Sequence, residues 1–315
     1  MTDTTIRMGY ACINMTLSNP PKRSGLPKVT TGRSIKQAGF YSKGLGHVGA
    51  LALQNAQDLL TILKWNERHG IRLFRLGSDL FPRHDHYETK ALPNYEACKE
   101  MLQECGRYAK EHGHRITTHP GPFHVLGSTN PAVVEKTIIG LERHSEVFDL
   151  MGFEPSFDNK INIHVGSAMM GRDQTAKQWI AGWKRLSEST RARVVLENDD
   201  KASLYSVQSL YNLFHQEIGI PITFDYWHHK FCTGDLSEEQ AVRLAASTWP
   251  SNVRQAVHYS ESRRDEQPAG PIKIREQAHA DYVRKPINTY GLSLDIMLEA
   301  KAKELALLEY IKLHS

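Results

Sequence analysis

Several short apolar runs in this chain each end on a residue whose side chain can bind a metal ion. The runs are ITTHP, INIHVG, VVLEND, ITFDYWHH, AVHYS and DIMLEAK, with the earlier run LFRLGSD, and their candidate ligands are His119, His164, Glu197, Asp225, His228, His258, Glu299 and Asp79. In a barrel of parallel strands the C-terminal strand ends surround one mouth, so these distant residues would meet. Imidazole and carboxylate groups together suit Zn²⁺, Mn²⁺ or Fe²⁺ better than Ca²⁺ or Mg²⁺, and several of them can hold more than one ion. The pattern predicts metal-dependent hydrolysis or isomerisation.

Each of these candidates also has a plainer structural interpretation. A single histidine at a strand end is more often hydrogen bonded within the fold than bound to metal, and the recurrence over many strands is what favours ligands at His119 and His164. Glu197 ends an apolar strand, where burial is costly without a cation, although an acidic helix cap is the alternative. Asp225 and His228 are three residues apart and could share one ion.

Three further candidates are less well defined by their sequence context. Glu299 opens EAKAKE and could instead be a first-turn acid that favours the helix dipole. His279, in AHADY, could be a further ligand or an acid that stabilises a leaving oxygen. His86, in PRHDHY, is a similar case, and its neighbours His84 and Asp85 make the local assignment ambiguous.

The elements that must position these residues alternate between strand-like runs and helical patterns, which is typical of βαβ units and a parallel sheet. Strands are predicted at about 7–13, 72–76, 115–118, 160–164, 192–196, 222–224, 253–257 and 294–298, and helices at about 50–69, 94–112, 131–151, 175–187, 202–217, 237–246 and 300–313. This order predicts a (β/α)8 TIM barrel that forms a single domain over residues 1–315. A doubly wound open sheet is the alternative, but no GxGxxG follows a strand and no Walker lysine motif is present.

The charge of the chain is uneven although its net value is only +4. No acidic residue occurs between Thr4 and Gln57, and a predicted loop at about 16–49 within this segment carries Lys22, Arg23 and Lys43 near Phe40 and Tyr41. Basic residues with aromatic neighbours can neutralise phosphates and stack on bases, which indicates nucleic acid; a solvated basic loop is the alternative. A late irregular insertion at about 261–285 adds Arg263, Arg264, Lys273 and Arg275.

The remaining composition is that of an ordinary globular protein, with a hydrophobic fraction of 40% and a charged fraction of 23%. The four cysteines lack a CxxC spacing, which favours reduced core thiols. No signal-peptide pattern and no apolar run of membrane-spanning length is present, so we expect a cytoplasmic protein that does not enter a membrane. Nothing in the sequence indicates a dimer interface, and we expect a monomer.

Nine motifs in order resemble the UV damage endonuclease family, which is related to the barrels of endonuclease IV and xylose isomerase. They are GYACIN, FRLGSDLFP with His86, HPG, NIHVGS, LEND, FDYWHH, VHYSESR, HADY and MLEAKAKE, and they extend from Gly9 to Glu304. The resemblance implies an ATP-independent endonuclease without a nucleotide cofactor that uses two or three divalent ions, most often Mn²⁺. It further implies nicking of double-stranded DNA immediately 5′ of a UV photoproduct, with 3′-hydroxyl and 5′-phosphate ends.

The resemblance also assigns roles to individual residues of this sequence. Metal-ligand positions correspond to His119, His164, Glu197, Asp225, His228, His258, His279 and Glu299, of which we expect Glu197, His258, His279 and Glu299 to be catalytic. His86 corresponds to a histidine near the metals, and Tyr10 and Asn14 correspond to positions close to the lesion-bearing strand. We expect Lys22, Arg23 and Lys43 to contact the DNA phosphates.

Two departures from the family pattern concern the lesion and the metals. The family has Gln-Tyr after HPG, a pair that wedges into the duplex, whereas this chain has Pro122 and Phe123. Phe123 can still stack on a base, but Pro122 has no amide to donate. The family also usually has a lysine two residues before the histidine of strand seven, and this chain has Ala256 there.

Three other functions are compatible with parts of this pattern. A sugar isomerase would use the same barrel and ions but would not need the basic loop, and its activity would not depend on salt. The second alternative is a related abasic-site endonuclease. The replacement of the family's Gln-Tyr pair by Pro122 and Phe123 favours this alternative more than an intact pair would. A barrel that only binds damaged DNA would not need so many metal ligands.

Overall fold

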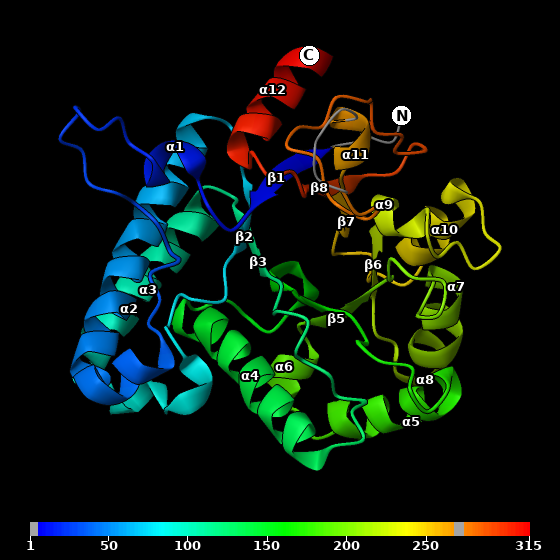
Figure 1. Ribbon diagram of the computed structural model, residues 1–315, viewed down its shortest axis with the longest axis horizontal. Helices are drawn as coiled ribbons and strands as arrows, with labels where there is room; N and C mark the ends of the chain where they lie inside the picture. The colour runs from blue at the N-terminus through cyan, green and yellow to red at the C-terminus, as the bar shows by residue number, and fades with distance from the viewer. Residues whose placement is uncertain (1–5, 268–273) are drawn as a thin grey trace.

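Eight parallel strands form a closed barrel, because each strand pairs with the next and the last pairs with the first. The computed structural model describes residues 6–267 and 274–315, and Figure 1 shows the strands surrounded by helices. The strands are β1 (Arg7–Ala11), β2 (Leu73–Leu76), β3 (Arg115–Thr118), β4 (Ile161–Ile163), β5 (Val194–Glu197), β6 (Ile222–Asp225), β7 (Gln255–Tyr259) and β8 (Leu294–Leu298). The predicted TIM barrel is confirmed, and closure excludes the doubly wound open sheet.

The helices follow the strands in the expected order. The longer ones are α2 (Gln37–Arg68), α3 (Tyr95–Glu111), α4 (Pro131–Leu150), α5 (Arg172–Trp183), α10 (Glu238–Ala246) and α12 (Glu304–His314). Single-turn helices are α1 (Met15–Ser18), α6 (Glu188–Arg191), α7 (Val207–Leu210), α8 (Gln216–Ile218), α9 (Tyr226–His229) and α11 (Arg263–Glu266), and a π turn at Tyr211–His215 joins α7 to α8. No helix in the described ranges combines the length and the apolar character that crossing a bilayer requires.

Several predicted boundaries are wrong, including those of the helices predicted at 175–187 and 300–313, which are Arg172–Trp183 and Glu304–His314 in the structure. The helix predicted at 50–69 begins at Gln37, because Phe40, Leu45 and Val48 pack on the core although Gly44 interrupts the helix with a φ of 67°. The strand predicted at 253–257 is two residues later, since its pairing with β8 continues to Tyr259. The helix predicted at 202–217 is divided by the π turn.

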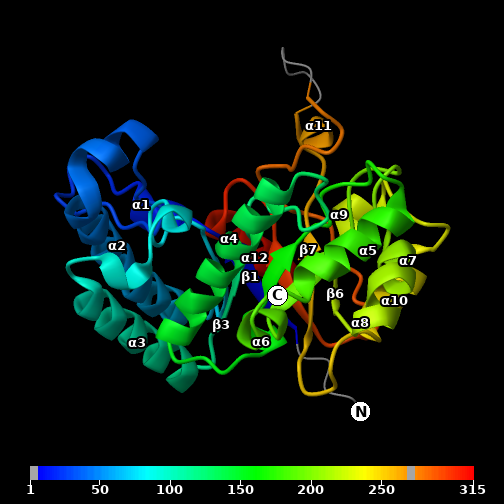
Figure 2. The ribbon, with the colours of Figure 1, turned by 90° about the horizontal axis from the view of Figure 1, so that it is seen from below.

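The basic loop is therefore partly helical, and buried carboxylates anchor it. Asp58 of α2 accepts hydrogen bonds from the Thr30 backbone N–H at 2.7 Å and from Arg33 Nη1 at 2.6 Å. Glu304 of α12 accepts hydrogen bonds from the backbone N–H groups of Met15 and Thr16, at 2.7 and 2.6 Å. Figure 2 shows that α1, the start of α2 and α11 project to one side of the barrel. The predicted basic residue Lys273 lies outside the described residues.

A buried ion cluster fills the interior at the N-terminal ends of the strands. The fully buried carboxylate of Asp295 accepts hydrogen bonds from Arg7 Nη2 at 2.6 Å, from Arg115 Nη1 at 2.8 Å and from Arg254 Nη1 at 3.1 Å. Burial would raise the pKa of Asp295, but the hydrogen bond from Arg7 and the charge of Arg115 hold it below its ordinary value. The cluster closes the end of the barrel opposite the strand ends that carry the candidate ligands.

Replacement of Asp295 by alanine is expected to lower the free energy of unfolding by about 3–5 kcal/mol, because the buried Arg115 guanidinium would lose its carboxylate partner. Since the folded-state pKa of Asp295 is depressed, its stabilising contribution is present at neutral pH and is lost as the pH falls through that pKa. Urea unfolding at pH 7 measures the effect. Asp158→Ala is the matched control, because that carboxylate also pairs with Arg115 but is 47% exposed; an equal loss in both variants would contradict the prediction.

Candidate metal centre

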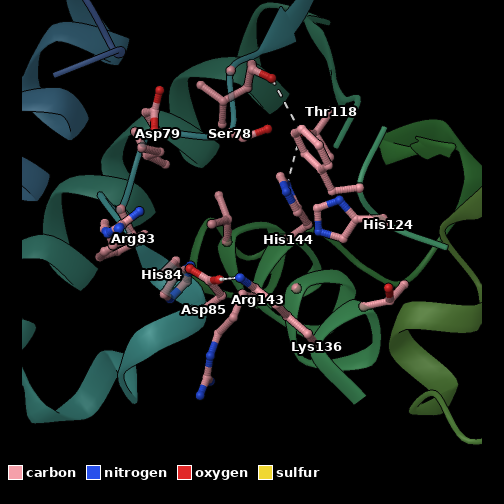
Figure 3. A pocket seen from close by; sticks show the side chains of 18 of the residues that line it. Ser78, Asp79, Arg83, His84, Asp85, Thr118, His124, Lys136, Arg143 and His144 are labelled. Carbon is pink, nitrogen blue, oxygen red and sulfur yellow. Dashed lines mark hydrogen bonds and ion pairs between the residues drawn. The ribbon is translucent and has the colours of Figure 1, made fainter. Parts of the chain in front are cut away.

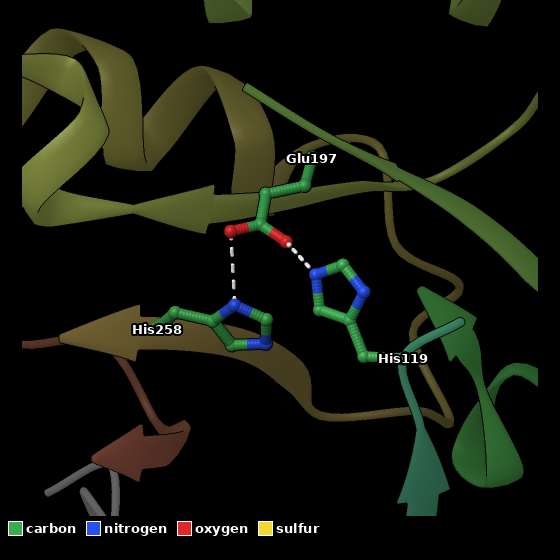
Figure 4. Close-up of side chains that lie close together, drawn as sticks. All are labelled: His119, Glu197 and His258. Atoms are coloured by element: carbon green, nitrogen blue, oxygen red, sulfur yellow. Dashed lines mark hydrogen bonds and ion pairs between the residues drawn. The ribbon is translucent and has the colours of Figure 1, made fainter. Parts of the chain in front are cut away.

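Glu197, at the end of β5, lies at the centre of a cluster of imidazoles. Its Oε2 is 3.0 Å from His119 Nε2, and its Oε1 is 3.0 Å from His258 Nδ1, as Figure 4 shows. His228 Nδ1 lies 3.5 Å from Oε1, and His164 Nε2 lies 3.8 Å from Oε2. Four histidines that are far apart in the chain therefore surround one buried carboxylate, as the strand-end pattern predicts.

A second carboxylate extends the cluster toward β8. Glu299, directly after β8, places Oε1 3.2 Å from His258 Nδ1 and Oε2 3.5 Å from His279 Nδ1. Asp225, at the end of β6, places Oδ2 3.9 Å from His228 Nδ1. We call this set of predicted ligands the cage; its members are His119, His164, Glu197, Asp225, His228, His258, His279 and Glu299.

Three groups within the cage have the geometry of a metal site. The ligand atoms in each group lie within 4.8 Å of one another, and the groups are His119 with Glu197 and His258, His164 with Glu197 and His228, and Asp225 with His258 and Glu299. Among residues 6–267 and 274–315, the buried Asp225 Oδ2 has no hydrogen-bond partner, whereas Oδ1 accepts from the backbone N–H groups of Trp227 and His228. A buried carboxylate oxygen without a donor fits a bound cation. Because neighbouring groups share Glu197 and His258, the cage could hold two or three ions.

Burial and mutual charge shift the pKa values of the cage in opposite directions. Burial would raise the pKa of Glu197, but the charges of His258 and His164 hold it well below its usual range. Burial raises the pKa of Asp225 to about 6, which the charge of His228 only partly opposes. Burial lowers the pKa of His258 to about 4, against the charge of Glu197. The His258 imidazole is thus neutral at pH 7.

Two cage histidines have the opposite shift. Burial would lower the pKa of His164, but the charge of Glu197 and the hydrogen bond to Asp199 raise it to about 10. Burial would also lower the pKa of His228, but the charges of Asp225 and Glu197 raise it to about 9. Without metal, both imidazoles are therefore protonated at pH 7 and must lose a proton before they can bind an ion.

We expect Mn²⁺ binding to release protons and to tighten as the pH rises from about 6 to about 9, because His164 and His228 must deprotonate. Calorimetric titrations in two buffers of different ionisation enthalpy would count the protons released per ion. His164→Gln should release fewer protons than the wild type, and His84→Gln is a control histidine whose low pKa of about 3 already keeps it neutral. Binding that does not change with pH would contradict the prediction.

Two basic side chains that the sequence analysis did not select lie beside the cage. Lys160, which precedes β4, is buried, and its Nζ lies 2.9 Å from Asn162 Oδ1, 3.0 Å from Thr223 Oγ1 and 3.3 Å from His258 Nε2. Arg75 of β2 forms an ion pair with Glu299. The spacing of Lys160 with Asn162 and His164 predicts that Lys160 lies on the same side as His164, because every second residue of a strand faces the same side.

The position of Lys160 is relevant to Ala256, which occupies the position where the family pattern has a lysine. The Ala256 side chain packs with Val195 and Trp249. The amine that reaches the space beside His258 belongs to the residue that precedes β4 and not to β7. A lysine is therefore present next to the cage, but from a different part of the barrel than the family pattern implies.

Other predicted site residues lie away from the cage. His86 contacts Phe40, at 5.6 Å between ring centroids, and Asp85, and no contact with the cage is found within the described ranges. Asp79 lines a neighbouring cavity. Tyr10 and Asn14 are buried, and Tyr10 Oη accepts from Asn14 Nδ2 at 3.0 Å and donates to Asn66 Oδ1 at 2.8 Å. Their burial argues against the predicted contact of Tyr10 and Asn14 with DNA.

The predicted surface residues are exposed as their proposed roles require. Phe123 is 86% exposed, and its neighbour Pro122 is also exposed. Lys22, Arg23 and Lys43 are exposed as well. The structure thus leaves these five side chains free to reach a large substrate.

A cavity of about 800 Å³ adjoins the cage between α4 and the loops that follow β2 and β3. Figure 3 shows its polar lining, which includes Asp79, Arg83, His84, His124, Lys136, Arg143 and His144. Thr118, the residue before His119, reaches into it and lies 3.2 Å from His144 Nδ1. Burial lowers the pKa of His144 to about 3, so this imidazole is neutral.

Comparisons with known proteins give one consistent result. Residues 6–315 match the family described as UV-endonuclease UvdE. The UV-damage endonuclease of Schizosaccharomyces pombe is 34% identical over 311 residues, which cover 96% of this chain and 50% of that protein. The putative UV-damage endonuclease of Acanthamoeba polyphaga mimivirus is 29% identical over 322 residues, with 98% and 91% covered. The chain thus spans about half the length of the fission yeast relative.

Solved structures support the same grouping. The crystal structure of SacUVDE has a TM-score of 0.80 with 29% identity and covers 98% of this chain and 97% of that one. Endonuclease IV from Thermus thermophilus has a TM-score of 0.52 with 15% identity, over 81% of this chain and 94% of that one. The second similarity shows a shared barrel fold alone.

Proposed function

Since the chain belongs to the UV-endonuclease UvdE family, we propose that it is a metal-dependent endonuclease that nicks double-stranded DNA immediately 5′ of UV photoproducts. The nick would leave a 3′-hydroxyl and a 5′-phosphate. The observation that carries the proposal is the cage, in which imidazoles from several strand ends meet the carboxylates Glu197, Asp225 and Glu299. Mn²⁺ is the ion we propose, because mixed imidazole and carboxylate ligands suit it.

The cage residues would bind and orient the reacting groups. When bound, two or three divalent ions would polarise the scissile phosphate and lower the pKa of a water molecule toward neutrality. Glu197 would connect two of the ligand groups, since both of its oxygens face imidazoles. His279 Nδ1 lies 2.9 Å from the Glu299 carbonyl oxygen, which leaves Nε2 to bind an ion or to donate a proton to the departing 3′-oxygen.

The surface around the cage would bind the DNA. The exposed basic residues Lys22, Arg23 and Lys43 would hold phosphates on either side of the cut. A photoproduct stacks and pairs poorly, so extruding it costs less free energy than extruding an intact dinucleotide. Phe123, exposed beside the mouth, would stack in the opened duplex.

A nicking assay with a substrate panel tests the proposal. UV-irradiated plasmid should be nicked in the presence of Mn²⁺, and EDTA should stop the reaction until Mn²⁺ is restored. Oligonucleotides with one photoproduct, one abasic site or no lesion then separate the related activities. Preference for the abasic site would favour the abasic-site endonuclease, and nicking that is indifferent to EDTA would refute the proposed chemistry.

Replacement of Phe123 by alanine is expected to reduce nicking of the photoproduct oligonucleotide about 10- to 100-fold, because stacking on one base contributes about 1–3 kcal/mol. Phe123→Tyr should retain most of the activity, since it keeps the ring. Met169→Ala is the matched control, because Met169 is equally exposed, at 88% against 86%. Unchanged nicking by Phe123→Ala would show that this ring does not contact the opened duplex.

A further inference from the structure

Arg75 places a permanent positive charge against Glu299, one of the three carboxylates of the cage. Its Nη1 donates to Glu299 Oε1, and the two side chains are only 13% and 14% exposed. A guanidinium keeps its proton in proteins, so this charge is present at every working pH. Within the described part of the chain, Arg75 Nε is buried without a hydrogen-bond partner, and the one ion pair of Arg75 is with Glu299.

The barrel is shaped to bring these two residues together. Arg75 is on β2 and Glu299 follows β8, and β1 lies between those strands. Beyond Arg7, β1 presents the small residues Gly9 and Ala11 toward the interior: a Cβ on Gly9 would lie 2.2 Å from the Leu73 carbonyl oxygen, and Ala11 packs against Leu73 and Met297. Side chains from β2 and β8 therefore meet across β1.

The ion pair uses an oxygen that also faces a predicted ligand. Glu299 Oε1 accepts the bond from Arg75 and lies 3.2 Å from His258 Nδ1, whereas Oε2 faces His279. Glu299, His258 and Asp225 form one of the three groups with metal-site geometry. A cation held between Glu299 and His258 would therefore meet the guanidinium at the same carboxylate.

We propose that Arg75 competes with the metal ion for Glu299. This inference rests on the proposed metal cage. Without an ion, Arg75 keeps the buried Glu299 paired; when an ion binds, Glu299 Oε1 exchanges the guanidinium for the ion. The charge of Arg75 repels a divalent cation at short range, so this side chain loosens the third ligand group. Arg75 is thus a positioning residue that stabilises the metal-free protein and limits metal affinity.

The test is Mn²⁺ binding to protein from which metal has been removed, measured by calorimetry without DNA. Arg75→Met should bind at least one ion about 10-fold more tightly than the wild type, because the competing charge is gone. Its metal-free melting temperature should fall by roughly 5 °C or more, since the buried Glu299 loses its permanently charged partner, and Mn²⁺ should restore most of this loss. Arg75→Lys keeps the charge and should bind Mn²⁺ with nearly wild-type affinity.

Two further variants make the result specific to Glu299. Arg75→Gln also removes the charge but retains a donor, and tighter binding is expected from it even if Arg75→Met does not fold. The double variant Arg75→Met/Glu299→Gln should bind no more tightly than Glu299→Gln alone, because the carboxylate for which the two cations compete is absent. Weaker or unchanged Mn²⁺ binding in the folded Arg75→Gln protein, or a gain that persists in the double variant, would overturn the inference. A wild-type protein that binds no Mn²⁺ would instead refute the cage and with it the proposed function.

Discussion

Replacement of Glu197 by glutamine is expected to reduce nicking of UV-irradiated plasmid by roughly 10³-fold or more, because the metal contribution to such reactions amounts to several kcal/mol. Glu197 belongs to two of the three ligand groups, and each of its oxygens lies 3.0 Å from an imidazole nitrogen. Glutamine has nearly the same shape but removes the negative charge that both groups share. Loss of one side chain therefore weakens more than one ion site.

The electrostatics of the cage make this substitution more damaging than the loss of a single ligand. The raised pKa values of His164 and His228 depend on the negative charge of Glu197, so the variant changes the protonation of both imidazoles as well as the ligand set. Metal content by mass spectrometry should fall together with the nicking rate.

Two controls separate loss of chemistry from loss of fold. Circular dichroism and melting temperature should show a folded barrel in Glu197→Gln. Glu96→Gln is the matched surface control, since this glutamate is 72% exposed on α3, and it should nick at the wild-type rate. A folded Glu197→Gln protein that still nicks within about 10-fold of the wild-type rate would remove Glu197 from the catalytic centre.

The position of the cage could be predicted because strand ends in a parallel barrel have a fixed destination. A residue at the C-terminal end of β3, β5 or β8, or directly after it, must lie at the same mouth whatever the loops do. His119, Glu197 and Glu299 were therefore found from local sequence alone. The strand predicted at 253–257 begins two residues too early, but the prediction for His258 is unaffected. His258 lies within β7 and faces the cage.

The basic partners of the cage could not be found in this way. Lys160 is buried against Thr223 and His258, which are 63 and 98 positions away in the chain. Arg75 pairs with Glu299 at a separation of 224 positions. A buried basic side chain is tolerated only because of such distant partners, and local hydrophobic patterning contains no information about them.

Most of the residues predicted to contact DNA are exposed, but Tyr10 and Asn14 are buried. Phe123 and the basic residues lie in loops, which are exposed by default. Tyr10 belongs to β1, and its neighbours in a strand alternate between the interior and the surrounding helices. The structure places Tyr10 on the helix side, where its ring contacts Phe74 at 5.2 Å between centroids. A motif match therefore identified the position without indicating which way the side chain points.

Affinity for photoproduct DNA is expected to fall by about 10³-fold between 50 mM and 200 mM salt if the protein makes about six phosphate contacts, because each neutralised phosphate releases counterions. Lys22, Arg23 and Lys43 are exposed, and the basic loop that carries the first two is anchored by Glu304 and Asp58. A basic surface held in place by buried carboxylates is what such contacts require. A sugar isomerase on the same barrel would show no comparable salt dependence.

A triple variant, Lys22→Ser/Arg23→Ser/Lys43→Ser, identifies the residues responsible. The slope of the logarithm of affinity against the logarithm of salt concentration should decrease by about 2–3, close to 0.9 for each lost contact. Lys99→Ser/Lys110→Ser/Lys184→Ser removes the same charge from α3 and from the residue that follows α5, and should leave the slope unchanged. Fluorescence anisotropy with a labelled photoproduct duplex measures both, in Ca²⁺ to prevent nicking. Equal slopes in the wild type and the first triple variant would show that the DNA binds another face of the protein. The cage could then be an endonuclease centre only if a different basic surface lay beside it.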